Sequence, residues 1–124
     1  MYKGKLRHKF YVKIQLKEII DINKLIDFYE NAYFPMAESS DSKEIKFYKP
    51  NQRFLIPIIN FHCPKKLFQN FKKKKYVFKI NYNFSKVIKF CKEIERKDKD
   101  TWINDIIINT YNKLNSLGKC HSVE

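Results

Sequence analysis

The chain has 124 residues, a length typical of a single domain, and its 44% hydrophobic and 16% aromatic content is too high for a disordered segment. Lys and Arg number 26 against 13 Asp and Glu, so the formal net charge of +13 favours nucleic acid, and less strongly an anionic membrane, as a partner. The chain has only two glycines, which excludes a glycine-rich phosphate-binding loop, and no apolar run is long enough to span a bilayer.

The first third of the chain predicts a strand, a helix and a polar loop. Residues 11–20 alternate loosely between apolar and polar side chains, which is typical of an edge strand. Asp21 can cap the helix that follows, because its side-chain oxygen can accept a hydrogen bond from the first turn. The apolar residues of this helix recur at helical spacing and are Ile22, Leu25, Ile26 and Tyr29. We expect the helix to end near Asn31 and residues 38–44 to form an acidic loop.

The middle of the chain predicts three short strands and one basic helix. Residues 46–48 and 53–56 have the composition of two strands, joined by a turn at 49–52. Pro64 suits the first turn of a short helix, since its fixed φ matches helical geometry. The apolar residues of that helix are Leu67, Phe68 and Phe71. Residues 76–82 alternate cleanly between two faces and predict a third strand.

Two amphipathic helices are predicted in the last third. Asn83 can cap the first helix and Asn104 the second, and Gly118 suits the position just after the second helix ends. The first helix has an apolar stripe that is expected to lie in the core: Phe84, Val87, Ile88 and Cys91, continued by Ile94. The stripe of the second is Ile107, Tyr111 and Leu114. Residues 120–124 then begin an extended segment, and the whole order of elements predicts an α+β fold.

Positive charge is concentrated in two segments. Residues 65–75 contain six lysines and no acid, and the first seventeen residues contain six basic residues and no acid. Such a segment can be an ordinary solvated face. It can also follow the phosphates of a nucleic acid, because lysine contacts to phosphate position a nucleic acid without reading its sequence. The sequence leaves both interpretations open.

The cysteines argue against a disulfide framework and a metal site. Cys63, Cys91 and Cys120 are far apart and odd in number. His62 adjoins Cys63, and Cys120 adjoins His121, but adjacent residues on a strand point to opposite faces. We therefore expect reduced thiols and no metal. The basic N-terminus lacks the apolar region of a signal peptide, so a cytoplasmic location is expected.

Two apolar features are less easily explained as core. Trp102 is the only tryptophan and lies just before a helix cap, after a charged loop. Residues 34–36, Phe-Pro-Met, follow the first helix and precede the acidic loop. Either feature can anchor a loop, or can offer a flat apolar surface on which a nucleobase stacks, an interaction of about 1–3 kcal/mol per base.

The chain resembles leucyl/phenylalanyl-tRNA–protein transferases in a set of ordered motifs. Residues 101–104 (Thr-Trp-Ile-Asn) and 121–124 (His-Ser-Val-Glu) are similar to the family's TWI and HSVE motifs, on either side of a helix. Further matches are Phe34-Pro35-Met36, Phe47-Tyr48-Lys49-Pro50 with Arg53, Phe61-His62, Phe84, Val87, Ile88 and Cys91. The likeness covers residues 21–124, and the set is specific although no single piece is.

The resemblance implies an aminoacyltransferase. Members of this family move Leu or Phe from aminoacyl-tRNA to an N-terminal Lys or Arg of a protein, which marks that protein for degradation. The expected partners are therefore the charged tRNA and the acceptor protein, without a membrane, a metal or a cofactor. The free α-amine of the acceptor attacks the aminoacyl ester, and the 3′-terminal adenosine leaves.

The resemblance also assigns binding residues. Trp102 corresponds to the aromatic residue that holds the 3′-terminal adenosine, and Met36 lies near the same nucleoside, although Met cannot stack as Trp can. Lys65, Lys72 and Lys73 correspond to basic residues that hold the acceptor stem. Lysine keeps the charge of the arginine in some members but cannot clamp a phosphate bidentately.

Family members continue past the HSVE motif into an acetyltransferase-like domain that carries the catalytic groups and the amino-acid pocket. The expected organisation is therefore a basic segment at 1–20, the transferase's N-terminal domain of short strands and three to four helices at 21–117, and the start of the missing domain at 118–124. We expect this chain to be an incomplete, inactive portion whose catalytic residues are not identified, with His121 and Glu124 structural.

Two other classes of protein remain possible from the sequence. One is a stand-alone RNA-binding module without catalysis. The other is a structural or partner domain whose lysines have no role in binding. Affinity for RNA at moderate salt separates the second class from the first, because phosphate contacts are strongly salt-dependent.

Overall fold

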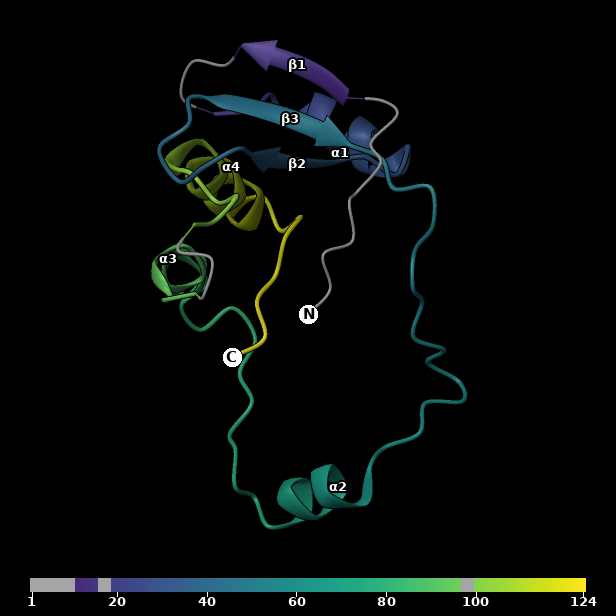
Figure 1. The fold of residues 1–124 in the computed structure, drawn as a ribbon. Coiled ribbons are helices and arrows are strands. Elements are labelled where there is room, and N and C mark those ends of the chain that lie inside the picture. Colours follow the sequence, from purple (N-terminus) through teal and green to yellow (C-terminus); the bar gives the residue numbers. More distant parts are fainter. Residues whose placement is uncertain (1–10, 16–18, 97–99) are drawn as a thin grey trace.

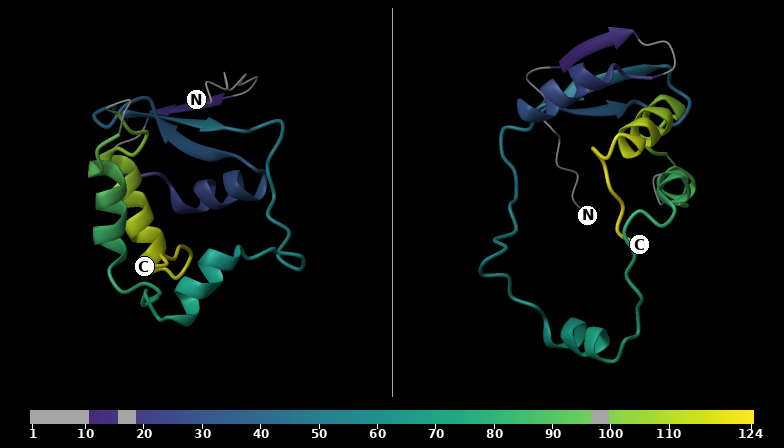
Figure 2. Two further views of the ribbon diagram at one scale, coloured as in Figure 1. Left: turned by 60° about the horizontal axis from the view of Figure 1, so that its bottom comes forward. Right: turned by 180° about the vertical axis from the view of Figure 1, so that it is seen from behind.

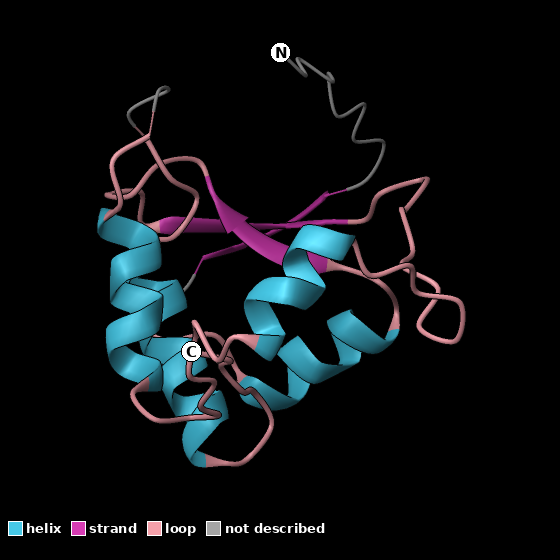
Figure 3. Ribbon diagram, turned by 90° about the horizontal axis from the view of Figure 1, so that it is seen from below, coloured by secondary structure: helices cyan, strands magenta, loops and turns pink. Residues whose placement is uncertain are grey.

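The computed structural model describes residues 11–15, 19–96 and 100–124, and for residues 11–15 it describes the backbone. The described residues form three strands and four α-helices, which confirms the predicted α+β class (Figure 1). All four helices lie on the same side of the sheet (Figure 3). None of these helices lies on the other face of the sheet.

The sheet is antiparallel, with strand order β1-β3-β2. The strands are β1 (Tyr11–Gln15), β2 (Phe34–Ala37) and β3 (Glu44–Tyr48). The central strand β3 pairs Tyr48 with Tyr11 on one side and with Phe34 on the other. The predicted edge strand is confirmed at 11–15, and residues 16–18 lie outside the described residues.

Alternation along β2 and β3 separates a core face from an outward face. Pro35, Ala37, Ile45 and Phe47 are buried, whereas the residues between them are only half-buried. The buried residues meet an apolar core that also contains Ile20, Leu25, Ile103, Ile106, Ile107 and Leu114. Sequence analysis missed β2 because a proline argues against a strand; here Pro35 is tolerated because β2 lies at the edge of the sheet.

Helix α1 (Ile22–Glu30) begins where predicted, since the Asp21 carboxylate accepts a hydrogen bond from the Lys24 N–H at 2.9 Å. Asn31 caps its C-terminus, also as predicted. The helix packs on the sheet through Leu25, which is fully buried, and through the ring of Phe28 stacked on that of Phe47 at 4.2 Å.

Helices α3 (Phe84–Glu93) and α4 (Asp105–Ser116) pack against each other. Both predicted caps are confirmed: Asn83 accepts from the Lys86 N–H at 3.1 Å and Asn104 from the Ile107 N–H at 2.9 Å. Beyond α4, Gly118 has a φ of +66° as expected. The expected core stripe of α3 is correct only for Phe84; Val87 and Ile88 are half-buried and Cys91 is exposed.

The segment from 49 to 83 leaves the sheet as a long excursion that contains α2 (Lys65–Lys72) (Figures 1 and 2). Pro64 is the residue just before this helix, one position earlier than expected. No residue of α2 is buried. The excursion exposes large apolar side chains, among them Phe54, Leu55, Ile56, Ile59, Phe71, Val77 and Phe78. An apolar surface of this extent is the kind that marks an interaction site.

Two predicted strands of the excursion are wrong. Residues 53–56 form no strand, because both neighbours of β3 are already β1 and β2 and no free edge of β3 is left. Residues 76–82 form only an isolated bridge between Ile80 and Val123, and Asn81 interrupts the extended backbone with a φ of +53°. Composition predicted the first of these strands and alternation the second, but a strand also requires a pairing partner.

Gly118→Ala is expected to lower the free energy of unfolding by about 1 kcal/mol, because an L-residue in the left-handed region is strained. A Cβ at this position meets nothing within 4 Å, so backbone strain is the only cost. Urea denaturation measures the loss. Gly118→Asn should lose less, and Lys119→Ala, an exposed neighbour, should lose almost nothing. Equal stability of Gly118→Ala and Lys119→Ala would contradict the expected backbone strain at position 118.

Candidate nucleic-acid interface

An apolar groove of about 300 Å³ lies between α3, α4 and the C-terminal segment. One wall is formed by Val87, Ile88 and Cys91 of α3, the stripe expected in the core. The remaining lining residues are Phe84, Trp102, Ile103, Ile107, Tyr111, His121, Ser122 and Val123. The Trp102 side chain is 44% exposed, so an indole and an apolar wall are accessible together. Such a concave apolar site with a few polar groups suits a flat ligand.

The structure brings the backbones of the two predicted adenosine-binding residues together but separates their side chains. The N–H of Ala37 donates to the carbonyl of Trp102 at 3.0 Å. The backbone of Met36, the residue before Ala37, therefore lies close to that of Trp102. Met36 is half-buried on the outward face of the sheet, opposite Pro35 and Ala37. Met36 does not line the groove. Trp102 and Met36 thus lie at the same edge of β2, but Trp102 lines the groove and Met36 lies on the outward face of the sheet.

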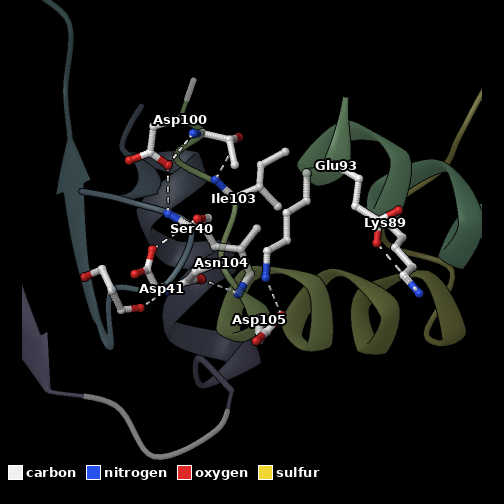
Figure 4. Close-up of polar contacts among 12 residues, drawn as sticks. Ser40, Asp41, Lys89, Glu93, Asp100, Ile103, Asn104 and Asp105 are labelled. Carbon is white, nitrogen blue, oxygen red and sulfur yellow. Dashed lines mark hydrogen bonds and ion pairs between the residues drawn. The ribbon is translucent and has the colours of Figure 1, made fainter. Parts of the chain in front are cut away.

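A polar junction holds the segment that carries Trp102 (Figure 4). The Asp100 carboxylate accepts from the Thr101 N–H at 2.7 Å and the Ser40 N–H at 3.2 Å. Asn104, which is 1% exposed, caps α4 and also donates its amide N–H to the Ser42 carbonyl at 2.7 Å. These bonds join the loop after β2 to both sides of Trp102. The position of the indole therefore depends on contacts over about sixty residues of sequence separation.

The C-terminal residues are held against the segment before α3. Backbone bonds join Lys79 and Glu124 in both directions at 2.8 Å. The Glu124 carboxylate accepts from the Asn83 N–H at 2.8 and 3.1 Å and from the Ser122 hydroxyl at 2.8 Å. The His121 ring pairs through Nδ1 with the Asn81 amide at 2.7 Å. His121 and Glu124 thus have structural partners, and the carboxylate lies at the N-terminus of α3, where the helix dipole favours negative charge.

Three titratable groups at or near the groove, Tyr29, Tyr111 and Cys120, favour their neutral forms. The hydroxyls of Tyr29 and Tyr111 are hydrogen-bonded to each other. Burial raises the pKa of Tyr111 far above its usual value of 10, and burial also raises the pKa of Tyr29. Burial raises the pKa of the Cys120 thiol as well, so a thiolate nucleophile is disfavoured there at neutral pH. These groups offer a hydrogen-bonding and apolar surface and no general base.

The three predicted phosphate-binding lysines lie on or just after α2, away from the groove (Figure 1). Helix α2 begins at Lys65 and ends at Lys72, and a spacing of seven residues places both side chains on one face of the helix. Lys73 is the C-cap. The Lys72 ammonium lies over the Phe68 ring at 4.7 Å, and all three lysines are exposed. The opposite face of α2 carries Leu67 and Phe71, and the helix separates cationic from apolar side chains.

Within residues 11–15, 19–96 and 100–124, no group of three or more His, Cys, Asp or Glu is arranged to hold a metal ion. No helix in that part of the chain is long and apolar enough to cross a membrane.

Comparison with known proteins defines the class of this chain. The family model described as leucyl/phenylalanyl-tRNA protein transferase matches residues 55–124, more than half of the chain. The leucyl/phenylalanyl-tRNA–protein transferase of Maricaulis maris is 35% identical over 101 residues, which cover 82% of this chain and 47% of that protein. The Chlorobaculum tepidum protein of the same name is 32% identical over 106 residues, which cover 86% of this chain and 54% of that protein.

The chain therefore belongs to the leucyl/phenylalanyl-tRNA–protein transferase family, as the resemblance of its motifs predicted. The name of this family is that of an aminoacyltransferase. The chain spans about half the length of the curated relatives that it matches.

Two features of the structure were not predicted from the sequence. The α3 stripe was assigned to the core because apolar residues at helical spacing cannot reveal whether another element covers them. The outward pair Phe34 and Tyr48 was missed because β2 was not recognised as a strand. The signal that could have located this pair is the two-residue alternation in Phe34–Ala37 and Glu44–Tyr48, which places both aromatic residues on the polar face.

Asp100→Asn is expected to destabilise the protein in a pH-dependent way. Hydrogen bonds from the Thr101 and Ser40 N–H groups lower the pKa of Asp100 below its ordinary 3.8. Because the folded-state pKa lies below the unfolded one, the stabilisation by the charged form is fully present above about pH 4 and is lost as the pH falls through the folded-state pKa. Denaturation of the unchanged protein and of Asp100→Asn at several pH values should show a difference in the free energy of unfolding that shrinks in acid. A difference that stays constant with pH would contradict this prediction.

Proposed function

We propose that this chain binds the 3′ end of an aminoacyl-tRNA as part of a transferase that moves Leu or Phe to the N-terminal Lys or Arg of a protein. The modified protein is then marked for degradation. The observation that carries this proposal is the partly exposed indole of Trp102 at the wall of an apolar groove. An adenine base is flat and apolar on its faces, and stacking on such a ring is worth about 1–3 kcal/mol.

Each predicted binding residue has a distinct role in this proposal. Trp102 stacks on the 3′-terminal adenine, and Met36 contacts the same nucleoside from across the edge of β2. Lys65, Lys72 and Lys73 lie along the phosphates of the acceptor stem as point charges. Six lysines without an acid at 65–75 make this helix attractive to a polyanion of any sequence.

The proposed reaction needs no metal and no cofactor. The unprotonated α-amine of the acceptor attacks the ester carbonyl carbon of the aminoacyl-tRNA, and a C–N bond forms. The ester C–O bond then breaks, and the ribose hydroxyl of the terminal adenosine leaves with a proton. An amine must lose a proton during this step, so a transferase of this kind benefits from a general base.

We infer that the groups that perform this step lie outside these 124 residues. His121 hydrogen-bonds with Asn81, and the Glu124 carboxylate accepts from Asn83 and Ser122. Both groups therefore already have structural partners in the C-terminal segment. The cytoplasmic location that the N-terminal sequence and the cysteines led us to expect remains a prediction.

Trp102→Leu is expected to weaken binding of a leucyl-tRNA by about 5- to 100-fold, the equivalent of one lost base–aromatic stack. Trp102→Phe keeps a ring and should lose less. Phe90→Leu is the matched control, because Phe90 is an exposed aromatic residue of α3 that does not line the groove. Fluorescence titration at fixed salt measures the affinities. If Trp102→Leu binds as tightly as the unchanged chain, Trp102 does not hold the adenosine.

A transfer assay tests the location of the catalytic groups. The chain is mixed with labelled leucyl-tRNA and a peptide that begins with Arg, and we expect no label on the peptide. Addition of the remainder of a full-length relative should restore transfer if the chain contributes the tRNA site. Transfer by the chain alone would contradict the inference and would direct attention to His121 and Glu124.

The second candidate function is an RNA-binding module without chemistry. The observation that favours it is the segregation of lysines on one face of α2, which by itself binds any polyanion. In that case loss of the Trp102 ring would weaken binding of RNA generally, and aminoacylation of the tRNA would make no difference to binding.

A further inference from the structure

The first limb of the excursion has a run of apolar side chains that the proposed adenosine site does not use. We call residues 54–59, Phe-Leu-Ile-Pro-Ile-Ile, the apolar run. Its large side chains are between 73% and 107% exposed: Phe54, Leu55, Ile56, Ile58 and Ile59. A single exposed apolar side chain is ordinary, but a contiguous run of them marks an interaction surface.

The apolar run has the composition of a strand but no strand to pair with. Consecutive residues of an extended backbone point to opposite sides, so a run of consecutive apolar residues is typical of a strand that is covered on both faces. The sheet of this chain offers it no free edge at β3. Among residues 19–96 and 100–124, no hydrogen bond reaches the backbone of residues 54–57. Pro57 restricts such a strand to the edge of a sheet.

Charge limits what can cover the apolar run. All thirteen Asp and Glu lie outside residues 45–92, and that segment has thirteen Lys and Arg, so it carries the whole formal net charge of +13. A second copy would bring a second cationic segment, and like charges oppose such a pairing. RNA supplies negative charge but no aliphatic surface. The complementary partner is a polypeptide with an apolar centre and Asp or Glu around it.

Uncovered apolar side chains continue on the second limb of the excursion, beyond α2 (Figure 2). The rings of Phe71 and Phe78 lie 6.2 Å apart and join α2 to this limb. Further along, Ile80 forms a bridge with Val123, and these two side chains are 72% and 73% exposed. Apolar surface is therefore available on both sides of α2 and reaches the C-terminal segment. A partner that covers only α2 would leave most of it exposed.

About half of each curated relative lies outside its match to this chain, because the matches cover 47% and 54% of the two proteins. We propose that the apolar run is a docking strand for that unmatched part of the transferase. Its side chains become buried on both faces, and its backbone pairs with a strand of the partner. The proposal rests on the proposed function in one respect, that this chain works as part of a transferase, and it does not need the adenosine site.

The test fuses the remainder of the Maricaulis maris transferase after Glu124 and compares backbone hydrogen exchange in the chain alone and in the fused protein. The amides of the apolar run should exchange at least about tenfold more slowly in the fused protein, because paired and buried amides open rarely. The acidic loop at 39–43 is the reference and should not change. The full-length Maricaulis maris protein is measured as well, since its fold does not depend on a fusion. Free exchange of its segment that matches the apolar run would overturn the proposal.

Two phenylalanines provide matched variants. Phe54 belongs to the apolar run, whereas Phe90 is an exposed residue of α3 outside it. In the chain alone, Phe54→Ser should leave the thermal melting unchanged, because the ring is fully exposed there. In the fused protein, Phe54→Ser should return the exchange of the run toward the rate of the chain alone, and Phe90→Ser should not. Equal effects of the two substitutions on the run would contradict a docking strand.

Other occupants give different results. If the run of the chain alone becomes protected as its concentration rises, and sedimentation shows a dimer, the occupant is a second copy and the proposal fails. If vesicles of phosphatidylcholine and phosphatidylglycerol bind the chain and release Phe54→Ser, the run binds an anionic membrane, and the proposal fails again.

The exchange measurement also separates this proposal from the adenosine site, because it contains no RNA. If Trp102→Leu leaves leucyl-tRNA binding unchanged but the run is protected in the fused protein, the adenosine site is wrong and the docking strand stands. If Trp102→Leu weakens binding but the run exchanges freely in both proteins, the docking strand is wrong and the adenosine site stands.

Discussion

The arrangement of this chain depends on the hydrogen bond from the Ala37 N–H to the Trp102 carbonyl, which joins the edge of the sheet to the start of the last helix. Without it, β2 would present an unpaired donor at its edge, and the indole would have no fixed relation to the strands. Asp100 and Asn104 bond to the loop after β2 on either side of Trp102 and support the contact. The apolar core beneath, centred on Ile45, Phe47 and Ile107, supplies the stability that keeps these polar bonds in register.

The molecule combines a well-packed part with a segment that is mostly exposed. The sheet, α1 and α4 share one core, whereas residues 49 to 83 place α2 and many large apolar side chains at the surface. Burial of apolar area is the main driving force of folding, so a segment with little burial is stabilised weakly by this chain alone. Its lysines remain solvated on one side of α2, and its apolar side chains remain available on the other. The positive charge and the apolar surface are thus concentrated in the same region.

The proposed function, as part of a leucyl/phenylalanyl-tRNA–protein transferase, would give these surfaces a common interpretation. A tRNA 3′ end offers phosphates, unpaired bases and an ester in one short segment. The chain offers lysines on α2 and an indole at the groove. The groups beside the groove, Tyr111 and Cys120, have pKa values raised by burial, and His121 and Glu124 are engaged in hydrogen bonds.

The sequence by itself determined the helices, because a helix depends on contacts within a few residues. Asp21, Asn83 and Asn104 each cap the turn that follows them, and Gly118 adopts the left-handed conformation that local geometry demands. The motifs were also local, so the family could be identified before the fold was known. The strands and the exposure of side chains were decided by the tertiary structure. A strand needs a partner, and β3 had room for β1 and β2 but not for residues 53–56. Likewise, the apolar pattern of Val87 and Cys91 could not reveal that they line an open groove, since only the packing of the other elements determines what covers a helix face.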